Sequence, residues 1–396
     1  MKMRILHVVP AYYPAVRYGG PIRSVHGLAV ALAQRGHEVH VATTSVDGPH
    51  DLDVPLGRPV DLDGVAVHYF RVPTLRRLCW SPSMAGWLER SIAHFDVVHL
   101  HSVYLWPTWA AAREARAHGV PYLVAPRGML IGEVIRRKSR WVKTAWIQLV
   151  ERATLEGSAG LHVTADLEAD EVKRLGLQAP RVFCIPNGVG VTGKAVPLAA
   201  GPFAHVPRPY ALFLSRISWK KGLDRLISAW QSVPDLELVI AGNDDEGYQP
   251  RLEALARSLG VGDRVHFVGP ASDQHKWALF EHAELFVLPS YSENFGNVVA
   301  EAMSMGCPVI VSDQTGIADL VRRSGAGIVT SGESLALAER IRFLYGDAAR
   351  RREMGARGKR VVTDELSWHA IAARMESAYR QILMDPQPST DLASAP

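Results

Sequence analysis

The sequence predicts an α/β protein with two Rossmann-like domains, each built on a parallel β-sheet. The chain has 396 residues, 47% hydrophobic and 21% charged, which is enough for two buried cores. Short apolar runs alternate with amphipathic segments in both halves, a pattern typical of parallel sheets covered by helices on both faces. A stretch rich in Pro, Gly and Ala at 191–209 separates the halves and predicts an interdomain linker.

The first half, residues 1–190, begins with a buried strand at Arg4–Val9, and an amphipathic helix follows at Val25–Gln34. We expect residues 73–87 to be irregular and residues 167–175 to form a helix. Strands are expected at 37–44, 65–71, 155–164 and 181–186, and strands that run into loops at 96–102 and 122–129.

The second half, residues 210–368, repeats this alternation, and a last helix is expected at 369–384. Residues 385–396 have the composition of a disordered tail. Strands are expected at 210–215, 236–241, 265–268, 281–288 and 309–311, and further helices at 223–230, 251–259, 297–305 and 335–345.

Composition narrows the class of protein. The net charge of +4 is too small to indicate a nucleic-acid partner. Cys79, Cys184 and Cys307 fit no metal-binding spacing and are typical of a reducing cytosol. The first apolar run is too short for a signal peptide, and no run reaches the ~20 residues that span a bilayer. We expect a cytoplasmic protein that is soluble or at most peripheral to the inner face of the membrane.

Basic side chains are concentrated between Arg127 and Arg152, where Trp141, Trp146, Ile147 and Leu149 are interleaved with Arg136, Arg137, Lys138, Arg140 and Lys143. Such a segment suits an anionic membrane surface or a phosphate-bearing substrate. The alternative is an ordinary helix with a solvated basic face.

Two loops that follow strands contain residues that are suited to binding a phosphate group. Gly19 and Gly20 precede Pro21 at the expected start of a helix, where backbone amides can approach an anion. In the second half, Arg216 and Lys221 lie between a strand and a helix, and two cations there can clamp a diphosphate. Taken alone, Gly-Gly is common in ordinary turns, and a cation pair such as Arg216 and Lys221 is more often simply a solvated turn.

Two histidines, His99 and His101, share one side of the strand at 96–102 because successive side chains of a strand alternate. They could bind a metal, but the sequence shows no third ligand. The commoner situation is one packed histidine and one that is hydrogen-bonded at the strand end.

Two glutamates flank the start of the helix at 297–305. Glu293 lies in the loop before the helix, which is the carboxyl end of a strand, and Glu301 lies in the helix. The backbone amides of 294–296 can face an anion or a sugar hydroxyl. Without other information, it is equally possible that Glu293 is only a helix cap and that Glu301 is only a solvated helix residue.

The residues around the two glutamates, from 293 to 308, favour a functional interpretation. Among them, Glu293, Phe295, Gly296, Glu301, Ala302, Gly306 and Pro308 resemble the E-x7-E signature of the retaining glycosyltransferases of family 4. The resemblance implies the GT-B fold, with two facing Rossmann-like domains and a deep cleft between them. It makes residues 1–190 the acceptor domain and 210–368 the donor domain, with the helix at 369–384 crossing back to the first domain.

The same resemblance implies roles for individual residues. The catalytic group would comprise Glu293, His101, Arg216 and Lys221, with His99 structural. The strand end at 264–270 would hold the base, and no cofactor or metal would be required. Donor contacts would come from Gly19, Gly20, Arg216, Lys221, Glu293, Phe295, Gly296, Asn297 and Glu301, and acceptor contacts from Arg127, Arg136, Arg137 and Lys138.

The implied reaction is transfer of a hexose, with retention, from a UDP- or GDP-sugar to a hydroxyl of a glycan. The basic segment suggests a polyprenyl-diphosphate-linked acceptor, as in exopolysaccharide or lipopolysaccharide synthesis, with peripheral contact to an anionic membrane. Two alternatives remain: an epimerase of the same fold, and a non-catalytic protein that binds nucleotide sugars. The missing G-x-G-x-x-G disfavours a nicotinamide dehydrogenase.

Overall fold

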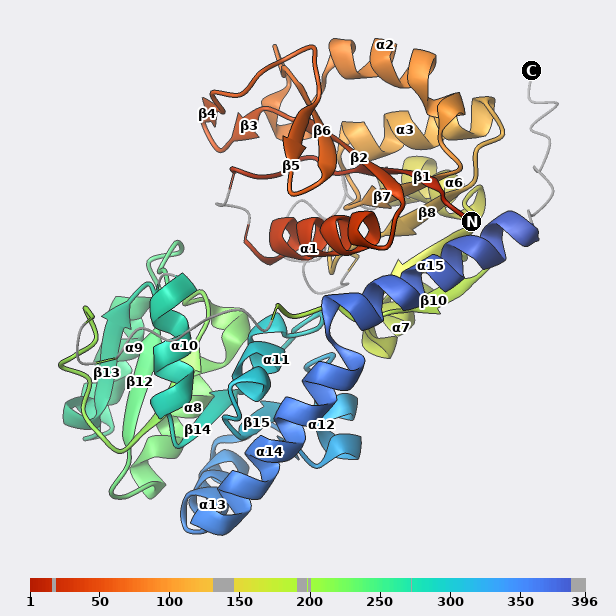
Figure 1. The fold of residues 1–396 in the computed structure, drawn as a ribbon. Coiled ribbons are helices and arrows are strands. Elements are labelled where there is room, and N and C mark those ends of the chain that lie inside the picture. Colours follow the sequence, from red (N-terminus) through yellow and green to blue (C-terminus); the bar gives the residue numbers. More distant parts are fainter. Residues whose placement is uncertain (16–18, 131–145, 191–197, 199–200, 272, 386–396) are drawn as a thin grey trace. The chain divides into compact units, whose positions relative to one another are not determined.

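A computed structural model describes residues 1–15, 19–130, 146–190, 198, 201–271 and 273–385. The chain divides into two compact units, Met1–Gly188 with Trp368–Pro396, and Val189–Ser367. Each unit has its own β-sheet with helices around it (Figure 1). The predicted α/β fold class with parallel sheets is confirmed.

The first unit is built on an eight-stranded sheet in the order β10-β9-β8-β7-β1-β2-β6-β5. Every neighbouring pair is parallel except β5 and β6. A separate antiparallel pair is formed by β3 and β4. The strands are β1 Arg4–Val8, β2 Glu38–Thr44, β3 Val46–Asp47, β4 His50–Asp51, β5 Val60–Leu62, β6 Val65–Phe70, β7 Val97–His101, β8 Tyr122–Ala125, β9 Gly160–Val163 and β10 Val182–Cys184.

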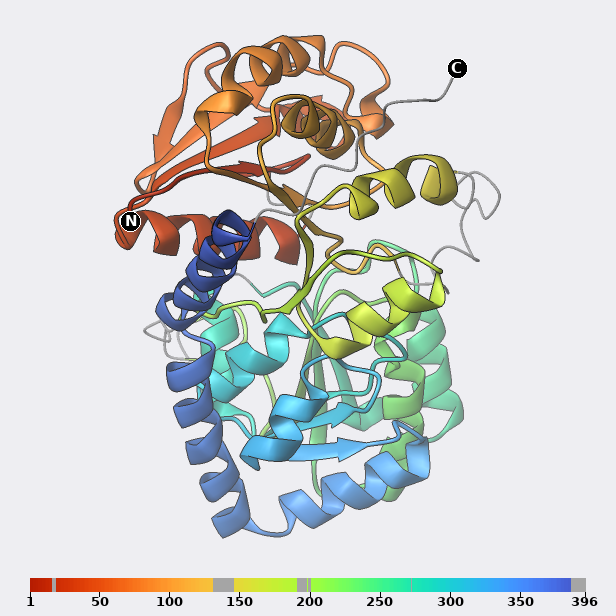
Figure 2. The same cartoon turned by 90° about the vertical axis from the view of Figure 1, so that its right-hand side faces the viewer.

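Helices cover both faces of this sheet. Both ribbon views place α2 and α3 on one face and α1 on the other (Figures 1 and 2). The helices are α1 Gly20–Gln34, α2 Pro82–Ser91, α3 Trp106–Ala117, α6 Arg152–Glu156, α7 Asp166–Arg174 and α15 Trp368–Met384, with short helical turns η2 Arg76–Leu78, η3 Ile92–His94 and η4 Ile147–Glu151.

The last helix, α15, packs on α1 within the first unit. A Cβ atom on Gly27 would lie 2.2 Å from the Trp368 ring, and one on Gly188 would lie 2.3 Å from it, so both positions need glycine. The carboxylate of Glu376 accepts a 2.7 Å hydrogen bond from Nε of Arg35 and lies 3.6 Å from Nε2 of His37. Ring packing and a half-buried ion pair therefore attach this helix.

The second unit has a six-stranded parallel sheet in the order β13-β12-β11-β14-β15-β16. Its strands are β11 Tyr210–Leu214, β12 Glu237–Ala241, β13 Val265–Gly269, β14 Leu285–Leu288, β15 Val309–Ser312 and β16 Gly327–Thr330. Its helices are α8 Leu223–Ala229, α9 Gln249–Ser258, α10 Asp273–His282, α11 Asn297–Ser304, α12 Ala318–Ser324, α13 Ser334–Tyr345 and α14 Ala348–Glu365, with turns η6 Trp219–Lys221, η7 Trp230–Ser232 and η8 Gly262–Arg264.

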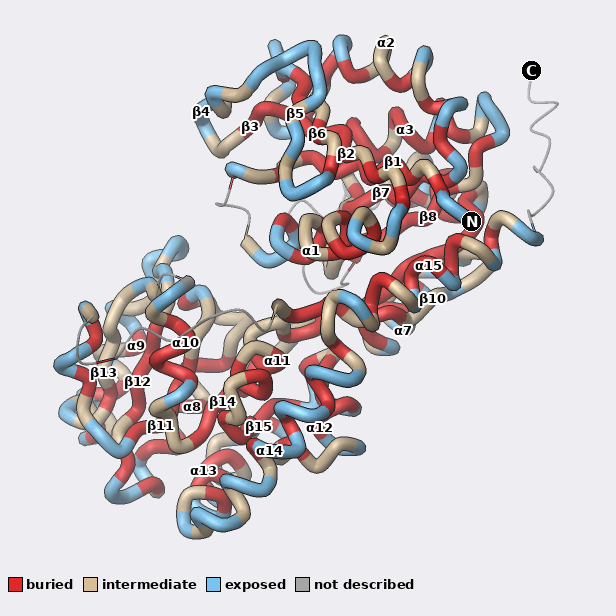
Figure 3. Tube along the Cα trace, viewed as in Figure 1, coloured by how far each residue is buried: buried red, intermediate tan, exposed pale blue. Residues whose placement is uncertain are grey.

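Strands β7, β14 and β15 are buried along their whole length, as the red segments of Figure 3 show. Parallel strands covered on both faces read as continuous apolar runs, which explains why most strands were predictable. Polar groups collect instead in the loops after the strands, which is where the predicted site residues lie.

Three predicted elements are wrong. Residues 73–87 are not irregular throughout, because α2 begins at Pro82 and the Ser81 hydroxyl caps it. The strand expected at 155–164 is the end of α6 followed by β9, with the chain turning at 157–159. The strand expected at 281–288 is only Leu285–Leu288, since residues 281 and 282 end α10. Helices α3, α10, α12 and α14 are additional.

Candidate active site

The loops after two neighbouring strands of the second unit meet through Lys221 and Glu293. Lys221 ends the turn that follows β11, Glu293 follows β14, and β11 pairs with β14 in the sheet. The Lys221 ammonium donates a hydrogen bond to the Glu293 carboxylate. Two loops separated by 72 residues therefore form one charged site.

Backbone contacts hold both partners of this ion pair. The amide of Glu293 donates to the carbonyl of Gln314 over 3.0 Å, and the amide of Gly316 donates to the Glu293 carbonyl over 3.0 Å. Gly222, beside Lys221, has φ +68°, and a Cβ atom there would lie 2.1 Å from the Pro289 carbonyl oxygen. Only glycine allows this approach of the two loops.

Arg216 offers a second cation after β11. Its side chain is exposed and makes no hydrogen bond or ion pair with any described residue. The site therefore combines a paired ammonium with a guanidinium that is open to solvent. A fork of N–H donors and a point charge in one place are suited to a phosphate or diphosphate.

The helix that follows Glu293 has no side-chain cap at its first turn. Gly296 occupies the position before α11 with φ +94°, and having no side chain it cannot cap the amides that follow. Phe295 is 5% exposed, so its ring belongs to the core and its backbone is what lies near the site. Asn297 is the first helical residue. These amides can bind an anion or hydroxyl oxygens.

Glu301 lies one turn further along α11 and is paired. Nζ of Lys276 lies 2.8 Å from Oε1 of Glu301. Lys276 is only 7% exposed, and its ammonium lies 4.6 Å from the centre of the Trp277 ring. Lys276 was missed from the sequence because nothing in its local pattern distinguishes it from other helical lysines.

In the first unit, Gly19 and Gly20 stand at the start of α1, as expected. Gly19 has φ +73° and precedes the helix, and Gly20 is its first residue. The helix starts five residues before the predicted Val25 because Pro21 is compatible with the first turn. The predicted contact of Gly19 and Gly20 with a donor phosphate stays a prediction.

A cluster of buried histidines lies at the carboxyl ends of strands in this unit. His7 of β1 is directly opposite His99 of β7, and His101 lies two residues further on the same side. The three side chains have no exposed surface, and His162 of β9 is 3% exposed. Nδ1 of His7 lies 2.9 Å from Nε2 of His101, and Nε2 of His99 lies 3.2 Å from Nδ1 of His162.

A backbone carbonyl can only accept a hydrogen bond, so the Ile185 carbonyl determines which ring nitrogens of His162 and His99 carry protons. Nε2 of His162 must donate to the Ile185 carbonyl at 2.9 Å, so His162 Nδ1 accepts from Nε2–H of His99. Nδ1 of His99 then accepts from the Tyr379 hydroxyl at 2.7 Å.

The Arg127 guanidinium fixes the other half of the cluster. It can only donate, so Nδ1 of His101 accepts from it at 3.1 Å, and Nε2–H of His101 donates to His7.

The cluster is neutral at physiological pH. Burial lowers the pKa of His7 and of His162 to about 3, and the nearby positive charge of Arg127 adds to the shift. Burial also lowers the pKa values of His99 and His101 well below the usual value, because a charged imidazole would lose its hydration there.

His101 is therefore placed differently from what its predicted role requires. Both of its ring nitrogens are hydrogen-bonded and its side chain is fully buried. A direct bond from its ring to a donor sugar needs one of those hydrogen bonds to open, and that role stays a prediction.

The structure also supplies the third histidine that the sequence did not show. One nitrogen from each of His7, His99 and His101 lies within 4.8 Å of the others. However, the rings of His7 and His101 are stacked 18° from parallel, and the Arg127 cation is hydrogen-bonded to the cluster. Both features oppose a metal ion, because ligand lone pairs must converge and a neighbouring cation repels it.

Of the four predicted acceptor residues, the structure describes Arg127 alone. Nη1 of Arg127 donates to Oδ1 of Asn187 over 2.7 Å, in addition to its bonds to His101. Arg136, Arg137 and Lys138 lie outside the described residues.

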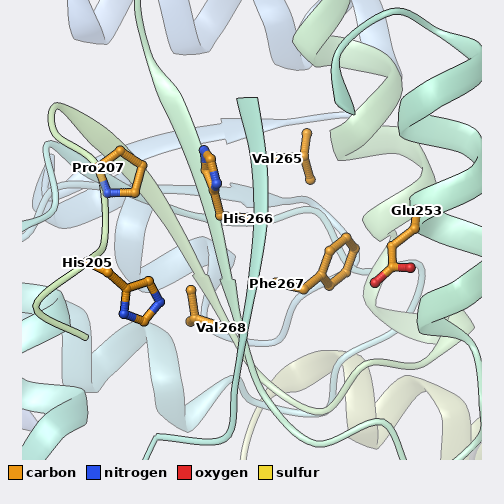
Figure 4. A pocket seen from close by; sticks show the side chains of 7 residues that line it. All are labelled: His205, Pro207, Glu253, Val265, His266, Phe267 and Val268. Carbon is orange, nitrogen blue, oxygen red and sulfur yellow. The ribbon is translucent and has the colours of Figure 1, made fainter. Parts of the chain in front are cut away.

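A pocket of the second unit lies along the edge strand β13 (Figure 4). Its volume is about 380 Å³, and it is lined by His205, Pro207, Glu253 and Val265 to Val268. Val265 and Phe267 point to one side of the strand and His266 and Val268 to the other, so the hollow wraps the sheet edge. It contains none of the individually predicted catalytic, donor-contact or acceptor residues, but Val265 to Val268 belong to the segment 264–270 that was predicted to hold the base. Base binding there stays a prediction.

Comparison with known proteins identifies the family. Residues 19–188 match the glycosyl transferase 4-like domain, and residues 202–361 match glycosyl transferases group 1. A GDP-mannose:cellobiosyl-diphosphopolyprenol alpha-mannosyltransferase of Komagataeibacter xylinus is 27% identical, over 99% of this chain and 97% of that protein. The chain belongs to the group 1 glycosyltransferases, as the E-x7-E resemblance predicted.

Solved structures confirm the fold. Sucrose-phosphate synthase of Thermosynechococcus elongatus has a TM-score of 0.74 and 24% identity, covering 97% of this chain and all of that one. Anabaena HepE, solved in complex with UDP and glucose, has a TM-score of 0.72 and 19% identity, covering 96% and 100%. The two α/β units thus have the GT-B fold.

Proposed function

We propose that this glycosyltransferase moves a hexose from a UDP- or GDP-sugar to a glycan hydroxyl, with retention and without a metal. The observation that carries this proposal is the ion pair of Lys221 and Glu293, with Arg216 exposed in the same loop as Lys221 and with no side-chain cap on the helix that follows Glu293. A diphosphate, a sugar and their negative charge require these complementary groups at one place.

The roles follow from the chemistry of each group. Arg216 and Lys221 neutralise the charge that grows on the leaving diphosphate. Glu293 and the amides of 295–297 hold sugar hydroxyls, and Glu301, oriented by Lys276, holds the ribose. The leaving phosphate itself takes the proton of the acceptor hydroxyl, so the reaction needs no protein base.

The nucleotide and acceptor are open within this proposal. The Komagataeibacter relative is named for GDP-mannose and a diphosphopolyprenol acceptor, whereas the Anabaena structure contains UDP and glucose. We favour a polyprenyl-diphosphate-linked glycan as acceptor because of the basic, tryptophan-bearing segment at 127–152.

The same segment underlies the proposed peripheral contact of a cytoplasmic protein with an anionic membrane. In the part of the chain that the structure describes, none of the helices has the length and apolar character to cross a bilayer.

The experiment is a transfer assay with UDP- and GDP-hexoses and lipid-diphosphate-linked or soluble glycan acceptors, in EDTA. NMR of the product reports the anomeric configuration. We expect turnover with one nucleotide class and a product that keeps the donor configuration. An inverted product or a strict need for added metal would refute those parts of the proposal. Donor binding without any turnover would favour the non-catalytic alternative, and interconversion of two nucleotide sugars would favour the epimerase.

A further inference from the structure

Tyr291 joins the two loops that contain the ion pair of the second unit. It follows β14 and precedes Glu293 by two residues. Its backbone amide donates to the carbonyl of Lys220 over 2.8 Å, and its hydroxyl lies 2.9 Å from Oδ2 of Asp224. Lys221 lies between these two contacts in the sequence. One tyrosine is therefore bonded to the chain on both sides of the lysine.

The hydroxyl of Tyr291 is the donor of its bond to Asp224, because a carboxylate can only accept. Burial and the bond to Asp224 raise the pKa of Tyr291, so the hydroxyl keeps its proton at neutral pH. Hydrogen bonds to a charged acceptor are stronger than those between neutral groups. This bond connects the loop after β14 to the first turn of α8.

The ring of Tyr291 is held as well. Cζ of Arg225 lies 3.5 Å from the ring centre, which is a close cation–π contact, and Nη2 of Arg225 lies 3.8 Å from Oε1 of Glu333. The guanidinium fixes the plane of the ring, and with it the position from which the hydroxyl reaches Asp224. Backbone amide, ring and hydroxyl of Tyr291 thus have separate partners.

The arrangement around Tyr291 has a cost. Oδ1 of Asp224 and Nη1 of Arg225 are buried without a hydrogen-bond partner in the part of the chain that the structure describes. Unpaired buried polar atoms are unfavourable and call for a functional explanation. A carboxylate that only served the first turn of α8 could remain in solvent. Its burial beside the tyrosine indicates that Asp224 serves to hold Tyr291.

We propose that Tyr291 and Asp224 are positioning residues of the donor site, which fix the lysine loop so that Lys221 stays opposite Glu293. The proposal rests on the proposed function, in which Lys221 takes the donor diphosphate. Both residues act through Lys221 and need no contact with the donor. A loop that is ordered before the ligand arrives does not have to be ordered by binding, which favours affinity.

The first test needs no ligand. Tyr291→Phe removes the hydroxyl but keeps the ring and the backbone amide. In the nucleotide-free full chain, acetic anhydride should acetylate Lys221 about 2-fold or more faster in this variant than in the wild type, because the ammonium leaves Glu293 more often. Peptide mass spectrometry locates the acetyl group. Equal rates of Lys221 acetylation would overturn the proposal.

Tyr345→Phe is the matched control. It deletes a hydroxyl of the same unit that donates to the Asp235 carbonyl over 3.0 Å. Asp235 precedes β12, so this bond lies at the amino end of the parallel sheet, whereas Tyr291 follows the carboxyl end of β14. The control should leave the acetylation of Lys221 unchanged, and an equal acceleration in both variants would overturn the proposal.

The second test measures whether Tyr291 acts through Lys221. Calorimetry with UDP and GDP should show that Tyr291→Phe binds the nucleotide about 2- to 10-fold more weakly, since the variant loosens the lysine loop but keeps the competing carboxylate of Glu293. In the Lys221→Met background, the same change should alter affinity by less than about 2-fold. An equal loss in both backgrounds would show that the tyrosine does not act through the lysine.

A conservative change of Asp224 completes the test. Asp224→Asn keeps an oxygen that can accept from Tyr291, so it should weaken nucleotide binding less than Asp224→Leu, and equal losses would contradict the assigned role. The two proposals fail separately. If no nucleotide binds the unaltered chain, the donor site is rejected, while acetylation of Lys221 still decides on positioning. If a nucleotide binds but Tyr291→Phe changes neither acetylation nor affinity, the positioning role alone is rejected.

Discussion

Lys221 and Glu293 form an ion pair between the loops after two adjacent strands of the second unit. Neither side chain is more than a fifth exposed, since 14% of Lys221 and 19% of Glu293 side-chain surface remains accessible. Before a ligand arrives, the carboxylate is the partner of the cation. Under the proposed function, an incoming diphosphate would compete with Glu293 for Lys221, and the carboxylate would become available to a sugar hydroxyl.

This competition predicts opposite effects on binding and turnover for Glu293→Gln. Removing the carboxylate frees Lys221, so UDP or GDP should bind roughly 2- to 10-fold more tightly. Turnover should fall on the order of 100-fold, because a neutral amide cannot replace the charge-assisted contact to the sugar. Calorimetry of the nucleotide and initial rates of transfer measure the two quantities. Weaker nucleotide binding in Glu293→Gln would contradict this account.

The ion pair that attaches α15 to α1 predicts that two glutamates contribute very differently to the free energy of unfolding. Glu376 is 8% exposed and bonds to Arg35 and Arg380, and these interactions lower its pKa to about 2 although burial opposes the shift. Glu376→Gln should lower the free energy of unfolding by about 1.5–3 kcal/mol. Glu353→Gln, which removes an exposed pair with Arg357, should cost at most about 0.5 kcal/mol. Urea unfolding of both variants tests this, and equal effects would refute it.

The buried histidines predict a loss of stability in mild acid. Their folded pKa values lie below 6.5, so below pH 6.5 the unfolded chain binds more protons than the folded one. Their contribution is fully present above pH 6.5 and decreases as the pH falls towards about 3. The slope is at most about 1.4 kcal/mol per histidine per pH unit.

Urea unfolding at pH 7.5, 6.5 and 5.5 measures this slope. His162→Gln, whose amide can still donate to the Ile185 carbonyl, should reduce it. His94→Gln, at an exposed position, should leave it unchanged. A wild-type protein that is equally stable at pH 7.5 and 5.5 would show that the cluster does not remain neutral.

Replacing Gly222 by alanine should destabilise the protein by more than the strain of a positive φ alone. Alanine there combines φ +68° with a Cβ atom 2.1 Å from the Pro289 carbonyl oxygen. Gly247→Ala is a suitable control in the same unit, because it has φ +66° but no atom within 4 Å of the added Cβ. We expect the control to lower the free energy of unfolding by roughly 1 kcal/mol, and Gly222→Ala to lower it by at least about 1 kcal/mol more. Thermal unfolding compares the two, and equal losses would mean that the loops can separate.

Much of the second unit's site was predictable because its residues follow strands in recognisable loops. Arg216, Lys221 and Glu293 each lie in a loop that follows an apolar strand, so their positions at one sheet edge follow from local pattern. That β11 and β14 are neighbours does not follow from their order along the chain, since β12 and β13 lie between them in sequence. The direct bond between Lys221 and Glu293 therefore required the structure.

The first unit was less predictable for a physical reason. His7 looks like any residue of a buried strand, and its role depends on the register that places it opposite His99. Arg127 looks like an exposed loop residue, whereas its guanidinium is enclosed by residues 26 and 60 positions away. The start of α2, by contrast, was missed although the sequence contains its signal. Ser81 is a capping serine, and Pro82, a first-turn proline, follows it.

The most direct test of the donor site is nucleotide binding to Lys221→Met, with Lys220→Met as its control. The two lysines are adjacent, but only Lys221 pairs with Glu293, while the Lys220 ammonium lies 6.0 Å from the centre of the Trp219 ring. Thermal shifts with UDP and GDP in EDTA should show one nucleotide stabilising the wild type, by roughly 2.7 kcal/mol at 100 times its dissociation constant. We predict that Lys220→Met keeps this shift and Lys221→Met loses most of it. No shift in the wild type, or the same shift in both variants, would contradict a donor site built on Lys221 and Glu293.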